Sequence, residues 1–285
     1  MFRSIERSIR RALSEYSSIG TKESILVLEA IIPQPWSLPV IRILYKISRE
    51  YKNRLIYLIY PWFLSTLAKR DQEVFYDELI EIDKDLVSPL IQRCLEDYQE
   101  PVERYTCLLK LGLLIGVNEA LRRRVKHVLF ACPRDSCFRR TLKSILLLDR
   151  ELLSEAVPRR VFSGVEVVNY LYDVSEEDLL ALAVSLKDIY SYNNSLKRFY
   201  EETGFSLEQL MEEYFEIQSS LEDIVYSGRR ELIYSSTEAV SRLYFERSDV
   251  KKCAICSAPI ERSRDLCRYC EKLSSFLNSF QKLSR

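Results

Sequence analysis

The sequence predicts an α/β fold with a doubly wound, mostly parallel sheet, followed by helices and a C-terminal zinc ribbon. Over the first 160 residues, short runs of branched apolar residues alternate with amphipathic stretches of helical period, which is the βαβ pattern. Near the end of the chain, two Cys-x-x-Cys pairs lie ten residues apart. With 285 residues, 47% of them hydrophobic and 29% charged, the chain can bury one large core and carry a small appendage.

The first half of the α/β pattern begins with a helix. Apolar residues at helical spacing predict this helix over 2–17, and the branched apolar run at 23–30 predicts a buried parallel strand. A helix should follow at 38–50, with Ser37 as its N-cap and Pro39 in its first turn. Further strands are expected at 54–60 and 74–82.

The second half continues the alternation and then becomes helical. Helices are expected at 86–98 and 102–119, a strand at 125–131, and a helix capped by Asp135 or Ser136 that runs to Leu153. Ser175 and Asp178 form a capping signature for the first of three helices near 175–190, 194–203 and 206–226. We therefore expect an α/β domain over 1–162, a helical extension over 163–247, and a zinc ribbon with a tail helix over 248–285.

Hydropathy and charge narrow the class of protein. The longest apolar run, 108–117, is interrupted by Lys110 and is shorter than the roughly 20 residues of a membrane span. No segment near Met1 resembles a signal peptide, so we expect a cytoplasmic protein without membrane contact. The 42 basic and 42 acidic residues give a net charge of zero, which by itself argues against a nucleic-acid binder.

The charge is nevertheless distributed in blocks. Basic residues exceed acidic ones in 1–70, 106–162 and 248–285, and the reverse holds in 71–105 and 163–247. A fold that gathers the basic blocks would create a positive surface, although solvated faces of mixed helices explain the pattern equally well. The candidate phosphate contacts are arginines of the first helix and of the segment before the strand at 125: Arg3, Arg7, Arg10, Arg11, Arg122, Arg123 and Arg124.

The two Cys-x-x-Cys pairs predict a metal site. Four thiolates at this spacing form a tetrahedral site that Zn²⁺ favours, and because all four ligands come from the protein the ion would be structural. Disulfides or free thiols are the alternative reading. The predicted ligands are Cys253, Cys256, Cys267 and Cys270. Six basic residues surround them and would either offset the thiolate charge or face a phosphate backbone: Lys251, Lys252, Arg262, Arg264, Arg268 and Lys272.

Helix, strand, loop, helix and strand at the start, with the zinc ribbon at the end, resemble the PP-loop ATPase family that 2-thiolates tRNA uridines. The resemblance spans nearly the whole chain. Family members carry a Cys-x-x-Cys, a basic helix and a strand in the region that reads here as Cys107-Leu-Leu-Lys110, the helix through Arg124, and 128–135. The stretch 168–178 is similar to the family segment that leads into a Glu-rich helix.

The catalytic parts of the family pattern are missing. A PP-loop is a Ser-Gly-Gly-x-Asp-Ser turn whose glycines let backbone N–H groups close on pyrophosphate. Residues 30–37 read Ala-Ile-Ile-Pro-Gln-Pro-Trp-Ser, without glycine, and only Ser37 matches. Lys110 replaces the second cysteine, Ala131-Cys132-Pro133 replaces Gly-His-Asn, and the family's later Cys-Pro-Tyr is absent. We expect neither ATP nor catalytic residues.

The other cysteines and the single histidine receive structural interpretations. Cys107 matches a family catalytic thiol in position, and we interpret it as an ordinary buried cysteine. Cys132 and Cys137 flank a helix start, where packing is favoured and redox use is the alternative. His127 lies inside a predicted strand and is interpreted as structural.

The resemblance implies a non-catalytic protein, similar to the second subunit of the cytoplasmic tRNA 2-thiolation complex. Such a subunit would pair with a catalytic PP-loop thiolase paralogue and contribute basic surface for tRNA, as a heterodimer or a homodimer. Two alternatives stay open. One is an enzyme whose nucleotide loop at 30–37 is remodelled, and the other is a zinc-ribbon adaptor for nucleic acid or protein that is unrelated to thiolation.

Overall fold

A six-stranded sheet forms the centre of the molecule, with strand order β3-β2-β1-β4-β6-β5. The computed structural model describes residues 2–63, 75–98, 101–146, 149, 151, 156–187, 189–204, 235, 239 and 250–273. All strand pairs are parallel except β5 with β6, so the mostly parallel α/β fold is confirmed. The strands are β1 (Ser24–Leu28), β2 (Arg54–Ile59), β3 (Glu78–Glu81), β4 (His127–Phe130), β5 (Arg159–Phe162) and β6 (Val165–Asn169).

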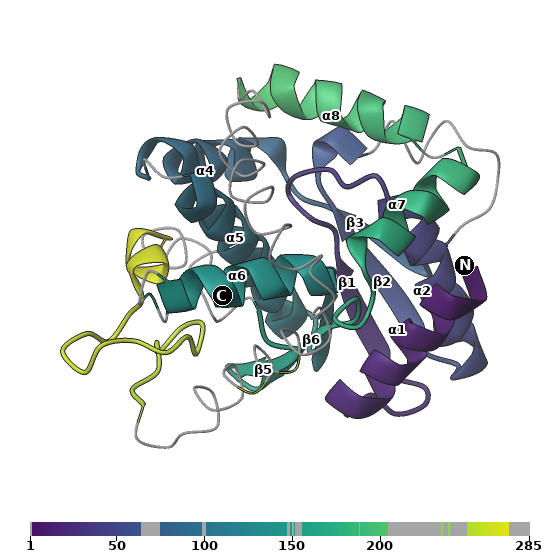
Figure 1. Cartoon of the computed structure of the whole chain (residues 1–285), viewed down its shortest axis with the longest axis horizontal. Coiled ribbons are helices and arrows are strands. Elements are labelled where there is room, and N and C mark those ends of the chain that lie inside the picture. The colour runs from purple at the N-terminus through teal and green to yellow at the C-terminus, as the bar shows by residue number, and fades with distance from the viewer. Residues whose placement is uncertain are drawn as a thin grey trace.

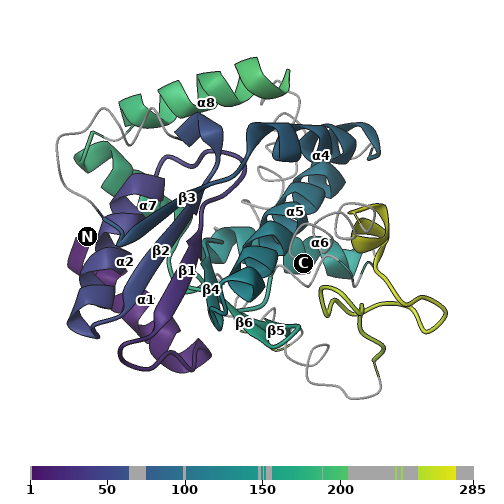
Figure 2. The same ribbon diagram turned by 180° about the vertical axis from the view of Figure 1, so that it is seen from behind.

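Helices cover both faces of this sheet (Figures 1 and 2). On one face lie α1 (Phe2–Tyr16), α2 (Ser37–Glu50) and α7 (Glu176–Ser185). On the other, α5 (Pro101–Arg122) crosses β1, β4 and β6, with α4 (Lys84–Glu96) packed beside it. The short 3₁₀ turn η1 (Pro61–Phe63) contacts α8 (Ile189–Thr203), and α6 (Arg134–Leu146) contacts α7. No helix in the described ranges is long and apolar enough to cross a membrane.

Two glycines one turn apart allow α5 to lie close to the sheet. A Cβ atom on Gly116 would meet Leu28 Cδ2 at 3.3 Å and Val128 Cγ1 at 3.6 Å. A Cβ atom on Gly112 would meet the Tyr60 hydroxyl oxygen at 3.4 Å. Because these neighbours are buried in the core, side chains at the two glycine positions would push the helix away from β1 and β4.

Two of the predicted caps are wrong. Trp36, not Ser37, is the N-cap of α2 and makes no side-chain capping bond, because Ser37 already belongs to the helix and turns its hydroxyl toward Glu29. Asp135 and Ser136 lie inside α6 and bond to Glu176 at the start of α7. α6 is described over Arg134–Leu146, and Asp149 lies outside a helix, so the helix does not run unbroken to Leu153. The Ser175 cap of α7 is confirmed, since its hydroxyl oxygen accepts from the Asp178 N–H at 3.2 Å.

The β5–β6 hairpin is a feature that the sequence patterns did not predict. Its two-residue turn, Ser163-Gly164, has positive φ angles of 48° and 83°, the backbone geometry of a type I′ hairpin turn. The expected boundary between residues 162 and 163 is the point where β5 ends and this turn begins, and the sheet continues through β6 to Asn169. The predicted helix at 206–226 and the tail helix after Leu273 lie outside the described residues.

The close approach of α5 makes Gly116→Val a test of this packing. We expect the substitution to lower the free energy of unfolding by about 1–3 kcal/mol, because the added side chain would overpack a filled core. Gly20→Val is the matched control, since a Cβ there meets only the flexible Glu23 carboxyl group at 3.6 Å. Urea denaturation of both variants measures the difference, and equal stabilities would contradict the packing described.

Candidate functional site

The carboxyl ends of β1 and β4 form the topological switch point of the sheet, where open α/β folds bind their ligands. Leu28 at the end of β1 is aligned with Leu58 of β2 and Phe130 of β4, so these strands end at one edge. A small cavity of about 10 Å³ lies there, room for about one water molecule. We call it the switch-point cavity. It is lined by Leu28, Glu29, Ala30, Gln34, Trp36, Ser37, Ile41, Tyr57, Ala131 and Tyr170.

The carboxyl group of Glu29 fills the position beside this cavity. Its side chain is buried, with the residue 6% exposed. Oε1 accepts from the Ser37 hydroxyl at 2.7 Å and from the Ala30 N–H at 3.0 Å, and Oε2 accepts from the Tyr57 hydroxyl. Burial raises the pKa of Glu29, and the three donors oppose that rise. Because Ser37 is the first residue of α2, an acidic side chain lies where helix N-termini commonly hold phosphate.

The loop that follows Glu29 is fixed under an aromatic cover. Ile31 and Ile32 are buried, and the indole N–H of Trp62 donates to the Ile31 carbonyl at 2.9 Å. The Trp62 ring stacks on Tyr60 at 5.3 Å and meets Phe199 of α8 edge-on at 5.2 Å. The segment 30–37 thus begins with an apolar, anchored part of the core.

A second site is formed by Cys253, Cys256, Cys267 and Cys270. All four are buried, and their sulfur atoms lie within 4.8 Å of one another. The turn that contains the first Cys-x-x-Cys pair is closed by the Ser257 N–H, which donates to the Cys253 carbonyl at 2.9 Å. In the second Cys-x-x-Cys pair, the Cys270 N–H donates to the Cys267 sulfur, with 3.3 Å between nitrogen and sulfur. The four predicted ligands thus converge into a group that could hold a metal ion.

The spacing of the sulfur atoms fits one tetrahedral ion. Zn–S bonds of about 2.3 Å place the sulfurs of a tetrahedral site about 3.8 Å apart. Cys256 and Cys267 Sγ are 3.6 Å apart, and none of the sulfur pairs exceeds 4.8 Å. A four-iron cluster would hold each sulfur on a different iron around a larger body, which needs wider separations. The donor set and its geometry therefore fit a single zinc ion.

Lys110 of α5 lies against the cysteine group, a contact that the sequence patterns did not predict. Lys110 is 1% exposed, and its ammonium nitrogen is 3.6 Å from Cys256 Sγ and 5.3 Å from the centre of the Tyr269 ring. Four thiolates around Zn²⁺ carry a net charge of −2, so a buried cation at this place offsets part of it. The one sequence signal was a lysine interrupting the apolar run at 108–117.

Most of the basic residues expected to offset the thiolates contact carboxyl groups instead. Arg268 pairs with Glu103 at 2.9 Å and also with Asp149. Lys251 pairs with Asp265 at 2.8 Å. Arg264 and Lys272 also have acidic partners, Glu151 at 3.2 Å and Asp97 at 3.9 Å. Two of these pairs join residues 250–273 to α5 and to the end of α4: Arg268–Glu103 and Lys272–Asp97. Tyr98, between these two helices, also stacks on Tyr269 at 5.2 Å.

The predicted nucleic-acid arginines divide into two groups. Arg10, Arg11, Arg122 and Arg123 form ion pairs within the chain; for example, Arg11 lies 2.9 Å from Asp173 and Arg122 lies 2.7 Å from Glu119. Arg3, Arg7 and Arg124 are exposed and make no ion pair with any part of the chain that the structure describes. Because their charges are not paired with described carboxylates, Arg3, Arg7 and Arg124 are better suited than the other four arginines to contact a phosphate backbone.

The remaining candidate residues are all buried. Cys107 is buried, as expected, but it forms a disulfide with Cys94, which corrects its interpretation as an ordinary buried cysteine. The packing of α4 against α5 brings together two residues whose spacing gave no signal. Cys132 and Cys137 are free thiols in contact, 3.2 Å between sulfurs. His127 bridges Glu23 and Glu166 at 3.0 and 2.9 Å, at the amino end of β4 and away from the switch point.

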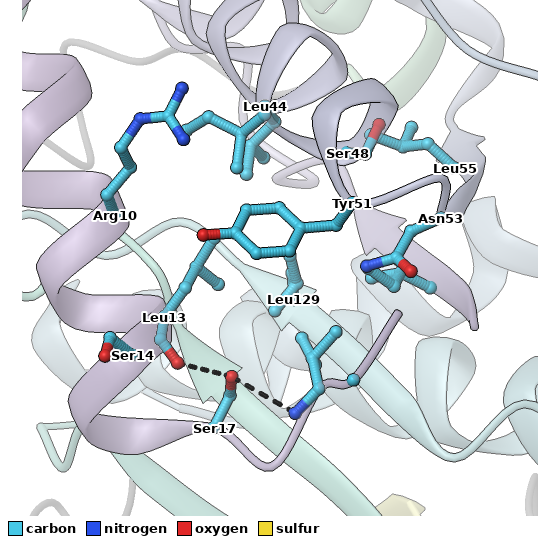
Figure 3. Close-up of a pocket in the computed structure, with 14 residues that line it drawn as sticks. Arg10, Leu13, Ser14, Ser17, Leu44, Ser48, Tyr51, Asn53, Leu55 and Leu129 are labelled. Carbon is cyan, nitrogen blue, oxygen red and sulfur yellow. Dashed lines mark hydrogen bonds between the residues drawn. The ribbon is translucent and has the colours of Figure 1, made fainter. Parts of the chain in front are cut away.

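A larger cavity, of about 260 Å³, lies between α1 and α2 (Figure 3). Leu13, Leu44 and Leu129 supply apolar lining, and the Tyr51 ring projects into it. Its floor includes Ile25 and Leu55, near the amino ends of β1 and β2. This cavity is therefore at the edge of the sheet opposite the switch point.

The contact between Lys110 and the cysteine group predicts the effect of Lys110→Met. Loss of the buried cation should weaken zinc binding about tenfold. This is the lower end of the range of losses that follow mutation of residues in contact with metal ligands. Lys251→Met is the matched control, because Lys251 is partly exposed and pairs with an exposed carboxylate. Competition with a chromophoric chelator measures both affinities. Equal zinc affinities in the two variants would show that Lys110 does not support the site.

The burial of Glu29 predicts a pH-dependent stability difference for Glu29→Gln. In the folded protein the pKa of Glu29 lies above its ordinary value of 4.5. At pH values between 4.5 and the folded-state pKa, the native protein binds more protons than the unfolded chain, so its stability falls as the pH rises through this range. Glutamine keeps an acceptor for Ser37 and cannot ionise. The stability of Glu29→Gln relative to wild type should therefore increase from about pH 4.5 upward. Urea titrations between pH 4.5 and 8 measure it, and a constant difference would contradict the assignment.

Comparison with known proteins gives a match at the level of structure. No protein-family model and no curated protein matches the chain. Among solved structures, the chain is similar to the U34-tRNA thiolase NcsA from Methanococcus maripaludis with its 4Fe–4S cluster. The TM-score is 0.59 at 13% identity, and the match covers 96% of this chain and 87% of that chain. At this identity the likeness establishes a shared fold.

Proposed function

We propose that the chain is a non-catalytic subunit of tRNA wobble-uridine 2-thiolation. In this role it supports an active PP-loop thiolase paralogue in the cytoplasm and contributes to tRNA binding. The observation that carries the proposal is a retained fold with a filled nucleotide site. The fold matches a U34-tRNA thiolase over 96% of the chain, while the switch-point cavity measures only about 10 Å³.

Three features of the switch point support the absence of nucleotide chemistry. The Glu29 carboxyl group lies at the start of α2 and accepts from the Ser37 hydroxyl, so it would compete with a phosphate for the same donors and the same space. Trp36 is 8% exposed and takes up space that a glycine would leave to the ligand. Pro33 and Pro35 lack the N–H groups that a phosphate-binding turn supplies.

The family's thiol chemistry is also replaced in this chain. Cys107, which matches a catalytic thiol of the family in position, is bonded to Cys94. Lys110, which stands where the family has a second cysteine, faces the cysteine group of the C-terminal segment. In this proposal, Lys110 supports a structural zinc ion at a position where the PP-loop family has a cysteine.

The proposed tRNA contact rests on exposed charge. Arg3 and Arg7 lie on the exposed side of α1, and Arg124 follows the end of α5. The C-terminal segment is held to α4 and α5 by the ion pairs of Arg268 and Lys272, which leaves its zinc site a role in maintaining shape. We assign that segment to the face that contacts the paralogue or the tRNA.

Co-purification tests the proposal. The full-length protein, mixed with an active PP-loop thiolase paralogue and bulk tRNA, should form a complex at micromolar concentrations that elutes as one species in size-exclusion chromatography. Elemental analysis of the pure chain should give one zinc and no iron per molecule.

Charge reversal provides the matched controls for tRNA. Arg3→Glu with Arg7→Glu should lower tRNA affinity and reduce the salt dependence, by about one unit of log–log slope for each phosphate that the protein no longer neutralises. Arg122→Glu, at a residue already paired with Glu119, should have a smaller effect. Failure to bind either the paralogue or tRNA would contradict the proposal and favour an unrelated zinc-ribbon adaptor.

A further inference from the structure

Cys132 and Cys137 form a pair of buried thiols that the proposed function does not use. Their sulfur atoms are 3.2 Å apart, and the residues are 2% and 4% exposed. A disulfide bond requires an S–S distance of about 2.05 Å, so a shift of roughly 1 Å would join them. Both cysteines are reduced in the structure, in contrast to Cys94 and Cys107.

The surroundings of the pair make the two sulfurs unequal. The Arg140 guanidinium lies 3.6 Å from Cys132 Sγ, and the Cys137 thiol donates toward the same sulfur. The hydrogen bond from Cys137 and the charge of Arg140 lower the pKa of Cys132, whereas burial raises the pKa of Cys137. Cys132 therefore has the properties of an attacking thiolate, and Cys137 those of a resolving thiol.

Asn169 holds the pair in place. Its side-chain amide exchanges two hydrogen bonds with the Cys132 main chain, at 3.0 and 2.7 Å, and its Nδ2 lies 3.3 Å from Cys137 Sγ. Because Asn169 is the last residue of β6 and Cys132 follows β4, the sulfurs are fixed at the carboxyl edge of the sheet. This geometry favours reaction of the two thiols with each other.

We propose that Cys132 and Cys137 are a redox centre that reduces a small hydroperoxide and closes a reversible disulfide. The Cys132 thiolate attacks the terminal peroxide oxygen, the O–O bond breaks, and with one proton taken up the products are a Cys132 sulfenic acid and water, or an alcohol from an organic peroxide. The Cys137 thiol then attacks the Cys132 sulfur; the S–S bond forms and a second water leaves. A dithiol reductant restores both thiols by exchange and is itself oxidised to a disulfide.

Peptide mapping of the full-length, zinc-loaded protein tests this centre. After treatment with hydrogen peroxide at pH 7.5, free thiols are alkylated and the protein is cleaved with trypsin. Cleavage after Arg134 separates the two cysteines, so the disulfide appears as peptides 127–134 and 135–139 joined with the loss of two hydrogens. We expect this linked pair to form with peroxide and to disappear with dithiothreitol.

Single variants assign the roles. In Cys137→Ser, a Cys132 sulfenic acid should accumulate and be trapped by dimedone. In Cys132→Ser, oxidation of Cys137 should be about tenfold slower, because that thiol is less ionised. Arg140→Gln should slow the reaction more than the matched variant Arg139→Gln, whose arginine pairs with Glu176 instead. Circular dichroism confirms that each variant is folded.

Three results would overturn this assignment. The first is recovery of Cys132 and Cys137 in alkylated form after peroxide exposure that oxidises free glutathione completely. The second is pairing of either cysteine with a different partner, and the third is an equal oxidation rate in the two single cysteine variants. None of these readouts depends on tRNA or on a paralogue, so the outcome is independent of the proposed function.

Discussion

The carboxyl group of Glu29 at the first turn of α2 is the contact around which the switch point is organised. In α/β folds, this place is a concentration of positive potential, because helix N–H groups and the ends of parallel strands converge there. The chain satisfies that potential with its own acidic side chain, tied to Ser37, Ala30 and Tyr57. A buried carboxyl group is costly, and its three donors reduce the cost.

Closure of the switch point has a structural consequence for the rest of the fold. The loop after β1 is apolar here: Ile31 and Ile32 are part of the core, and the Ile31 carbonyl is held by Trp62 of η1. On the other side of the sheet, α5 connects this core to the cysteine group: Gly112 and Gly116 face β1 and its loop, while Lys110 faces Cys256. One helix therefore links the closed site to the metal site.

Much of the fold was predictable because the dominant signals are local. The apolar runs of β1, β2 and β4 and the capping signature of α7 identify themselves within a few residues. The cysteine quartet was equally clear, since its four ligands come from one short segment. The Ser163-Gly164 turn was also a usable local signal, but the preceding strand begins with two arginines and resembles a loop in composition.

What could not be predicted depends on contacts between distant parts of the chain. Lys110 and Cys256 are 146 residues apart, and Cys94 and Cys107 meet only because α4 packs against α5. Ser37 was assigned to capping because its residue type favours that role; whether its hydroxyl faces its own helix or Glu29 is decided by the sheet. Asp135 similarly serves the helix beside its own.

Calorimetric titration of the full-length protein with ATP shows whether the switch point is closed to nucleotides. A switch point filled by Glu29 and Trp36 predicts no saturable heat at millimolar ATP, in the wild type and in Ser37→Ala alike. A 1:1 binding isotherm in the wild type that Ser37→Ala abolishes would mean that the switch point is not closed and that the loop at 30–37 opens to hold a nucleotide.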